Sequence, residues 1–133
     1  MYHEQHSGAV VAHLTLGEDE IALLDMEAGV EHFGRGTDNS VDGILMIVDP
    51  SFESLRLSAK IADLSTSIGK PIWFCLNKVT EETAQMMEAE VGKHGAIIGR
   101  MPLNHDLALA GLTGTELQMT IAPVREMARF LTQ

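Results

Sequence analysis

The sequence predicts an α/β domain with a doubly wound, mainly parallel sheet and helices on both faces. Four apolar runs do not alternate between apolar and polar residues, which is typical of strands buried on both faces. Between these runs, apolar residues recur every three or four positions, the spacing of amphipathic helices. An alternating order of helices and strands implies right-handed crossovers and one sheet. The predicted strands span residues 21–25, 43–49, 71–77 and 96–102.

Length and charge narrow the class of protein. A chain of 133 residues can form one domain with its own core, so we treat residues 1–133 as a single α/β domain. The formal net charge of −10 disfavours nucleic acids and anionic membranes as partners, because both would repel such a surface. No apolar run has transmembrane length, and the first residues lack the pattern of a signal peptide. We therefore expect a cytoplasmic protein.

The first predicted helix precedes the first strand, and the second follows the second strand. A short helix is expected within residues 7–16, before the first strand. The next helix spans residues 51–68, where Asp49 or Ser51 can cap its start. Gly69, followed by a Lys-Pro pair, can end it.

Two more helices complete the predicted order. One spans residues 81–91, with Thr80 as its N-cap and two glutamates in its first turn. The last spans residues 117–131, with a capping box in residues 113–116. Pro123 falls inside this last helix and predicts either a kink or a late start.

Polar residues follow the predicted strands, and ligands of doubly wound sheets bind at the carboxyl ends of strands. Polar residues also occur there simply because the chain turns, so each residue alone is ambiguous. The residues at these ends are Asp25, Asp49, Asn77 with Lys78, and Pro102 followed by residues 103–106.

Asp25 has the strongest pattern of these residues. It ends an apolar run, and Gly29 follows four positions later. In nucleotide hydrolases such an Asp binds or orients the ligands of Mg²⁺, and the Gly N–H meets a terminal phosphate, where a Cβ would not fit. The alternative is an Asp that caps the following turn.

Asn77 and Lys78 suit the recognition of a nucleotide base. An Asn amide can donate and accept at one base edge, and a Lys stem can lie along a ring face. The alternative is an ordinary polar turn. The single cysteine, Cys75, excludes a disulfide within the chain and is expected to be a small core residue. We predict no metal site.

Four stretches together closely resemble the CooC-type ATPases, which assist maturation of nickel carbon monoxide dehydrogenase and belong to the MinD/NifH-like class of P-loop ATPases. The resemblance covers roughly residues 9–130, and its most specific part is DMEAGVEHFGRGT. The four stretches are LLDMEAGVEHFGRGT, VDGILMIVDPSFESLRLSAKIADLS, IGKPIWFCLNKV and GRMPLNHDLALAGLTG.

The resemblance implies a role for the residues around Asp25. Asp25, Glu27 and Gly29 match the family's switch II segment, which takes part in catalysis. ATP and Mg²⁺ are the family's ligands. The resemblance implies the fold of the family's ATPase domain for the same stretch of chain.

The resemblance also implies a base-binding side. Asn77 and Lys78 match the family's Asn-Lys pair that reads the nucleotide base. Pro102, Leu103 and Asp106 match the loop that closes over the base after the next strand.

The departures from the family are as informative as the matches. The 133 residues contain no GKGGxGK[ST] loop, and no Cys-x-Cys pair of the kind that binds nickel across the family's dimer. The chain therefore looks like the C-terminal portion of a CooC-type ATPase domain, with a vestigial switch II. We expect no cofactor for this chain alone and no autonomous ATP hydrolysis.

The expected function is that of a truncated CooC-like maturation protein. The alternatives are a non-enzymatic interaction or regulatory module, and half of a split ATPase completed in trans by a P-loop-bearing chain. In the parent class, the P-loop strand lies between the strand before Asp25 and the strand at residues 43–49. Its absence would leave apolar sheet edges that invite pairing. We therefore expect a homo-oligomer, or a complex with a full-length ATPase relative or carbon monoxide dehydrogenase.

Overall fold

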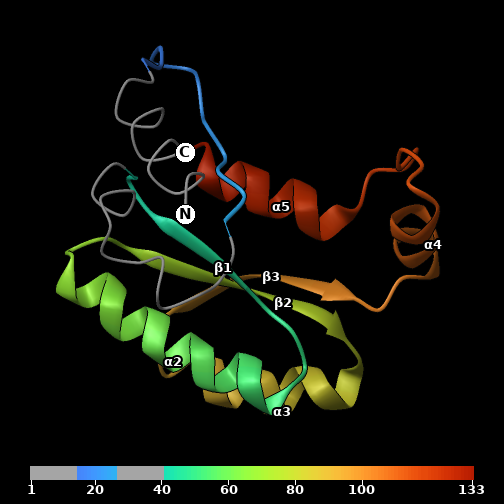
Figure 1. Cartoon of the computed structure of the whole chain (residues 1–133), viewed down its shortest axis with the longest axis horizontal. Coiled ribbons are helices and arrows are strands. Elements are labelled where there is room, and N and C mark those ends of the chain that lie inside the picture. The colour runs from blue at the N-terminus through green and yellow to red at the C-terminus, as the bar shows by residue number, and fades with distance from the viewer. Residues whose placement is uncertain (1–14, 27–40) are drawn as a thin grey trace, which may run out of the picture.

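The computed structural model describes residues 15–26 and 41–133. Within them, three parallel strands form one sheet in the order β1-β2-β3. Figure 1 shows this sheet between α5 on one side and α2 and α3 on the other, so the predicted doubly wound α/β class is confirmed. The elements are β1 (Ile44–Val48), α2 (Phe52–Ser67), β2 (Ile72–Val79), α3 (Glu81–Val91), β3 (Ala96–Pro102), α4 (His105–Thr113) and α5 (Ala122–Leu131).

Helix α2 begins and ends at the signals that the sequence contains. The Ser51 hydroxyl accepts a hydrogen bond from the Ser54 N–H at 3.1 Å, which satisfies one of the free N–H groups of the first turn. Gly69 then adopts a φ of 70°, a left-handed conformation that glycine reaches without a Cβ clash. The predicted start at Ser51 and end near Gly69 are confirmed.

Helix α3 also follows the prediction, with the expected N-cap at Thr80. The Thr80 hydroxyl accepts from the Thr83 N–H at 3.2 Å, and the Thr83 hydroxyl accepts from the Thr80 N–H at 2.8 Å. This reciprocal pair is a capping box, with Thr83 in the place of the more common Glu or Gln.

The main core lies between the sheet and the two helices α2 and α3. Fully buried side chains come from both the sheet and the two helices: Val48, Phe74, Leu76, Ile61 and Val91. Burying each such side chain contributes roughly 1.5–3 kcal/mol. The buried hydroxyls of Ser58 and Ser65 on α2 donate to backbone carbonyls of their own helix, and these hydrogen bonds offset the cost of their burial.

The opposite face of the sheet is covered by α5, which contacts β3. Gly99 allows this close approach, because a Cβ at Gly99 would overlap the side chain of Met127 on α5. Near the end of α5, Phe130 meets Trp73 of β2 edge to face, with ring centroids 5.9 Å apart. Cys75 is buried on this face, beside Ile47 and Gly99 in the strand register.

The predicted first strand, residues 21–25, is wrong. Residues 21–26 have no regular secondary structure and are exposed, and Leu23 keeps 81% of its surface accessible. A strand is stable only when a neighbour pairs its N–H and C=O groups, and no described residue does so here. The helix expected in residues 7–16 lies almost entirely outside the described residues.

The predicted long helix over residues 117–131, with its capping box at 113–116, is wrong in its first third. Gly114 has a φ of 67° and ends α4, so these residues form a helix C-terminus. Helix α5 begins only at Ala122, which places Pro123 in its first turn, where the missing N–H is tolerated. Of the two outcomes predicted for Pro123, the late start is confirmed.

Candidate functional site

The carboxyl ends of the three parallel strands lie at one edge of the sheet. In Figure 1 the arrows of β2 and β3 point to the same side, where α4 lies. The register pairs Val48 with Leu76, so the next residues of β1 and β2, Asp49 and Asn77, stand opposite each other. This edge is where ligands of such sheets bind.

A hydrogen bond joins these two residues. The Asn77 side-chain Nδ2 donates to the Asp49 Oδ1 at 2.9 Å. The Asp49 backbone N–H donates in turn to the Ser54 hydroxyl at 3.0 Å, which ties the strand end to the first turn of α2. The amide of Asn77 is therefore held in one orientation, and no described residue bonds its oxygen or its second N–H.

Lys78 stands at an irregular position of β2. The register between β2 and β3 shifts between Leu76 and Val79, so Asn77 and Lys78 fall within the break. Lys78 has a φ of 53°, a left-handed conformation that no other non-glycine residue adopts in the described parts of the chain. Such a backbone state costs about 1–3 kcal/mol, and residues held in it cluster at functional sites. Its side chain is exposed.

The predicted base loop lies directly beside this irregularity. Val79 pairs with Pro102, and the Leu103 N–H donates to the Val79 carbonyl at 3.2 Å. The Leu103 side chain is 68% exposed. The structure thus brings Pro102 and Leu103 next to the end of β2.

The rest of the predicted loop is the start of a helix that sequence reasoning missed. Asn104 caps α4 by accepting the Leu107 N–H at 3.1 Å, and Asp106 lies in the first turn. Both positions favour helix formation, so Asp106 has a structural role there whether or not it meets a ligand. An Asn cap and a terminal Gly114 bracket α4 and were visible in the sequence.

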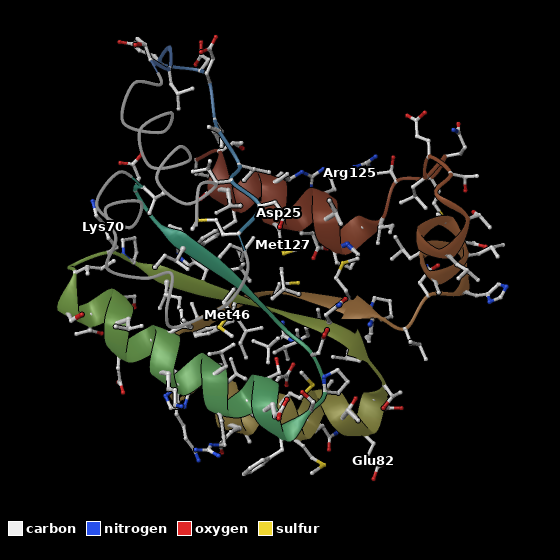
Figure 2. The ribbon with its side chains drawn as sticks, viewed as in Figure 1. Asp25, Met46, Lys70, Glu82, Arg125 and Met127 are labelled. Carbon is white, nitrogen blue, oxygen red and sulfur yellow. The ribbon has the colours of Figure 1, made fainter. Side chains whose placement is uncertain are left out.

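Asp25 does not lie at the end of a strand of this sheet, unlike Asp49 and Asn77. It is exposed, belongs to no strand, and is drawn in Figure 2 in the region of α5, on the side of the sheet opposite α2. Glu27 and Gly29 lie outside the described residues. The geometry of a switch II segment is therefore not seen in the described parts of the chain.

Nothing in the described residues is arranged to hold a metal ion. No group of three or more His, Cys, Asp or Glu side chains gathers there. Burial raises the pKa of the Cys75 thiol and so disfavours the thiolate form that binds metals. Among the same residues, no helix has the length and apolar character needed to span a bilayer.

Sequence comparison gives the chain several relatives, although no family model matches it. It is 38% identical over 120 residues to an uncharacterised ATP-binding protein of Methanocaldococcus jannaschii, covering 90% of this chain and 48% of that protein. A second ATP-binding protein of the same organism is 29% identical over 125 residues, with the same coverage.

A third relative is the carbon monoxide dehydrogenase accessory protein CooC of Rhodospirillum rubrum. The identity is 30% over 106 residues, which is 79% of this chain and 40% of CooC. The chain spans about half the length, or less, of the curated relatives that it matches. Over most of its own length, the chain is therefore related to CooC and to uncharacterised ATP-binding proteins.

Proposed function

We propose that the chain is the base-side portion of a CooC-like nucleotide-binding protein that takes part in maturation of carbon monoxide dehydrogenase. The observation that carries this proposal is the Asn77–Asp49 hydrogen bond beside the left-handed Lys78, at the ligand-binding edge of the sheet. The relationship to CooC and to ATP-binding proteins supports the same ligand class.

The chemistry of this edge suits adenine. The 6-amino group of the base can donate to the free acceptor atoms of Asn77 or Asp49, and a ring nitrogen can accept the remaining Asn77 N–H. The Lys78 stem can cover one ring face, since its side chain is free to extend over the edge. The exposed Leu103 beside Val79 offers apolar contact from the loop.

The sequence contains no P-loop to bind the phosphates. A P-loop supplies several backbone N–H groups and a Lys, and the 133 residues contain no such loop. A base pocket alone should bind at about millimolar Kd, or about −4 kcal/mol. Asp25, Glu27 and Gly29 would act on Mg²⁺ and phosphate only with a P-loop present, and the exposed Asp25 alone does not form a Mg²⁺ site. The described residues also do not fit nickel.

The test is a titration of isotope-labelled protein, followed by amide chemical shifts, with Mg-ATP, ADP and adenosine. We expect the three ligands to bind with similar affinity, to shift residues near Asn77, and to lose binding in Asn77→Ala. Lys93→Ala, on the exposed surface of the loop after α3, is the matched control and should bind normally. Micromolar affinity for Mg-ATP would refute the proposal, as would turnover of ATP that Asp25→Ala abolishes.

A second candidate is a subunit that another polypeptide completes. No described residue pairs with the outer edge of β1, and Ile47 on this strand is 50% exposed. Unpaired edges with apolar side chains favour strand addition from another chain. We propose as occupants a second copy, a P-loop-bearing relative, or carbon monoxide dehydrogenase, with the chain acting as an interaction module or as half of a split ATPase.

Light scattering distinguishes this second candidate. We expect a mass above that of one chain at high micromolar concentration, or co-purification with a P-loop-bearing relative that restores ATP turnover. A chain that stays monomeric and binds neither a P-loop-bearing relative nor carbon monoxide dehydrogenase would rule out this role. The strand edge is then simply tolerated as an exposed edge.

A further inference from the structure

The side-chain amide of Asn77 can face its neighbour Asp49 in only one way. Its Nδ2 donates to the Asp49 Oδ1 at 2.9 Å. An amide that is turned over would place its oxygen against the carboxylate, and a carboxylate offers acceptors only. Turning the amide over would therefore exchange a charge-assisted hydrogen bond for a repulsive contact between two oxygens. Asp49 thus fixes which end of the Asn77 amide faces away from it.

Asp49 is itself fixed against the first turn of α2. Its backbone N–H donates to the Ser54 hydroxyl at 3.0 Å, and its carbonyl accepts the Ser51 N–H at 2.8 Å. The parallel register of β1 and β2 places Asp49 opposite Asn77. The carboxylate therefore reaches Asn77 from a backbone that both the sheet and the start of the helix hold in place.

The fixed amide presents an acceptor to a base at this edge. With Nδ2 turned to Asp49, the other end of the Asn77 amide is Oδ1, and no described residue donates to it. Asn77 is partly exposed and Asp49 is exposed, so a ligand can reach both. The 6-amino group of adenine can donate to this oxygen, whereas the 6-oxo group of hypoxanthine or guanine would set one acceptor against another. The pair therefore favours a 6-amino purine.

We propose that Asp49 is a positioning residue that makes the base site selective for 6-amino over 6-oxo purines, and that it acts by holding the Asn77 amide. This inference rests on the proposed function and adds the specificity of its base site. Asp49→Asn removes the constraint, because the new amide can either donate to Asn77 or accept from it. The Asn77 amide then has two bonded orientations, one that accepts at the base edge and one that donates.

The test compares AMP and IMP, which share their sugar and phosphate and differ at position 6 of the base. Amide chemical shifts of the full, isotope-labelled chain give the two dissociation constants, and their ratio is the readout. Wild-type protein should prefer AMP about tenfold, as expected when a matched hydrogen bond is replaced by a contact between two acceptors. In Asp49→Asn the ratio should fall to within about twofold of unity, because both amide orientations are then bonded.

A double variant that preserves the charge separates positioning from direct contact of Asp49 with the base. Asp49→Asn/Asn77→Asp exchanges the two side chains, so the new amide can donate to the new carboxylate and residue 77 again presents an acceptor. The preference for AMP should return in this variant. If Asp49 selected the base by touching it directly, the exchange would not restore the preference.

Asp63→Asn is the matched control for the change of charge. Asp63 is exposed in the C-terminal half of α2, whereas Asp49 meets the first turn of that helix. This variant should keep the wild-type ratio. Equal affinity for AMP and IMP in the wild-type protein, an unchanged ratio in Asp49→Asn, or no recovery in the exchanged pair would each overturn the positioning role and leave the base site standing. If the wild-type protein bound neither nucleotide, the proposed base site itself would be refuted, and its specificity with it.

Discussion

The two faces of the sheet differ in how completely they are covered. On the face toward α2 and α3, Val48, Phe74 and Leu76 have no accessible surface. On the face toward α5, Cys75 is buried under the helix but its neighbour in register, Ile47, is half exposed. The face toward α2 and α3 therefore holds the larger core, whereas the face toward α5 is covered over β2 and β3 and exposed at β1.

The largest expected effect tests this contrast directly. Phe74→Ala on the closed face should lower the free energy of unfolding by about 3–5 kcal/mol, because it leaves a large cavity. Ile47→Ala on the open face should lower it by less than about 1 kcal/mol, since half of its surface is already in water. Urea unfolding of both variants gives the values. Similar losses at the two positions would mean that the open face is covered in solution.

The next effect concerns the part of the second face that is closed. Gly99→Ala should cost about 1–3 kcal/mol, because its Cβ meets the Met127 side chain and forces α5 outward. In a Met127→Ala background the same substitution should be nearly neutral. A double-mutant cycle in urea measures this coupling. Additive effects would show that α5 does not press on β3 at this point.

The same contrast explains how much the sequence could predict. The strand at residues 96–102 and the helix at residues 81–91 were predicted with the bounds that the structure has. The two elements contact each other on the face of the sheet toward α2 and α3, so their local sequence pattern agrees with the tertiary contacts that they make. The predicted strand at residues 21–25 failed because its pattern indicates burial that no described part of the chain provides.

Local signals also competed near the carboxyl end. The Thr-Gly-Thr-Glu stretch matches a capping box, but Gly114 at positive φ ends α4 instead. At the candidate site, the residue types at the strand ends were predictable, whereas the Asn77–Asp49 pair depends on strand register and was not predicted. The left-handed backbone at Lys78 has no signal in the sequence, because lysine does not favour that conformation.

A smaller effect compares helix starts on the closed face. Ser51→Ala should lower the free energy of unfolding by about 1 kcal/mol, because the Ser54 N–H loses its acceptor. Ser51→Asp keeps an acceptor and should stay near the wild-type value. Thermal unfolding followed by circular dichroism suffices for this comparison. A neutral Ser51→Ala would show that the first turn of α2 is held by its packing rather than by its cap.

The smallest effect probes the covered part of the second face through pH. Burial raises the pKa of the Cys75 thiol above that of the unfolded chain, so the folded state holds this proton more tightly. The contribution of this thiol to the free energy of unfolding is therefore fully present below the ordinary thiol pKa of about 8.5. It is lost as pH rises through the raised pKa. Cys75→Ala should remove this part of the alkaline loss, which unfolding in urea at pH 7 and pH 10 can measure. Cys75 is buried, whereas Ile47 beside it is half exposed. Two results together would show that α5 detaches readily from this face of the sheet: an unchanged alkaline loss of stability in Cys75→Ala, and rapid reaction of the wild-type thiol with a disulfide reagent.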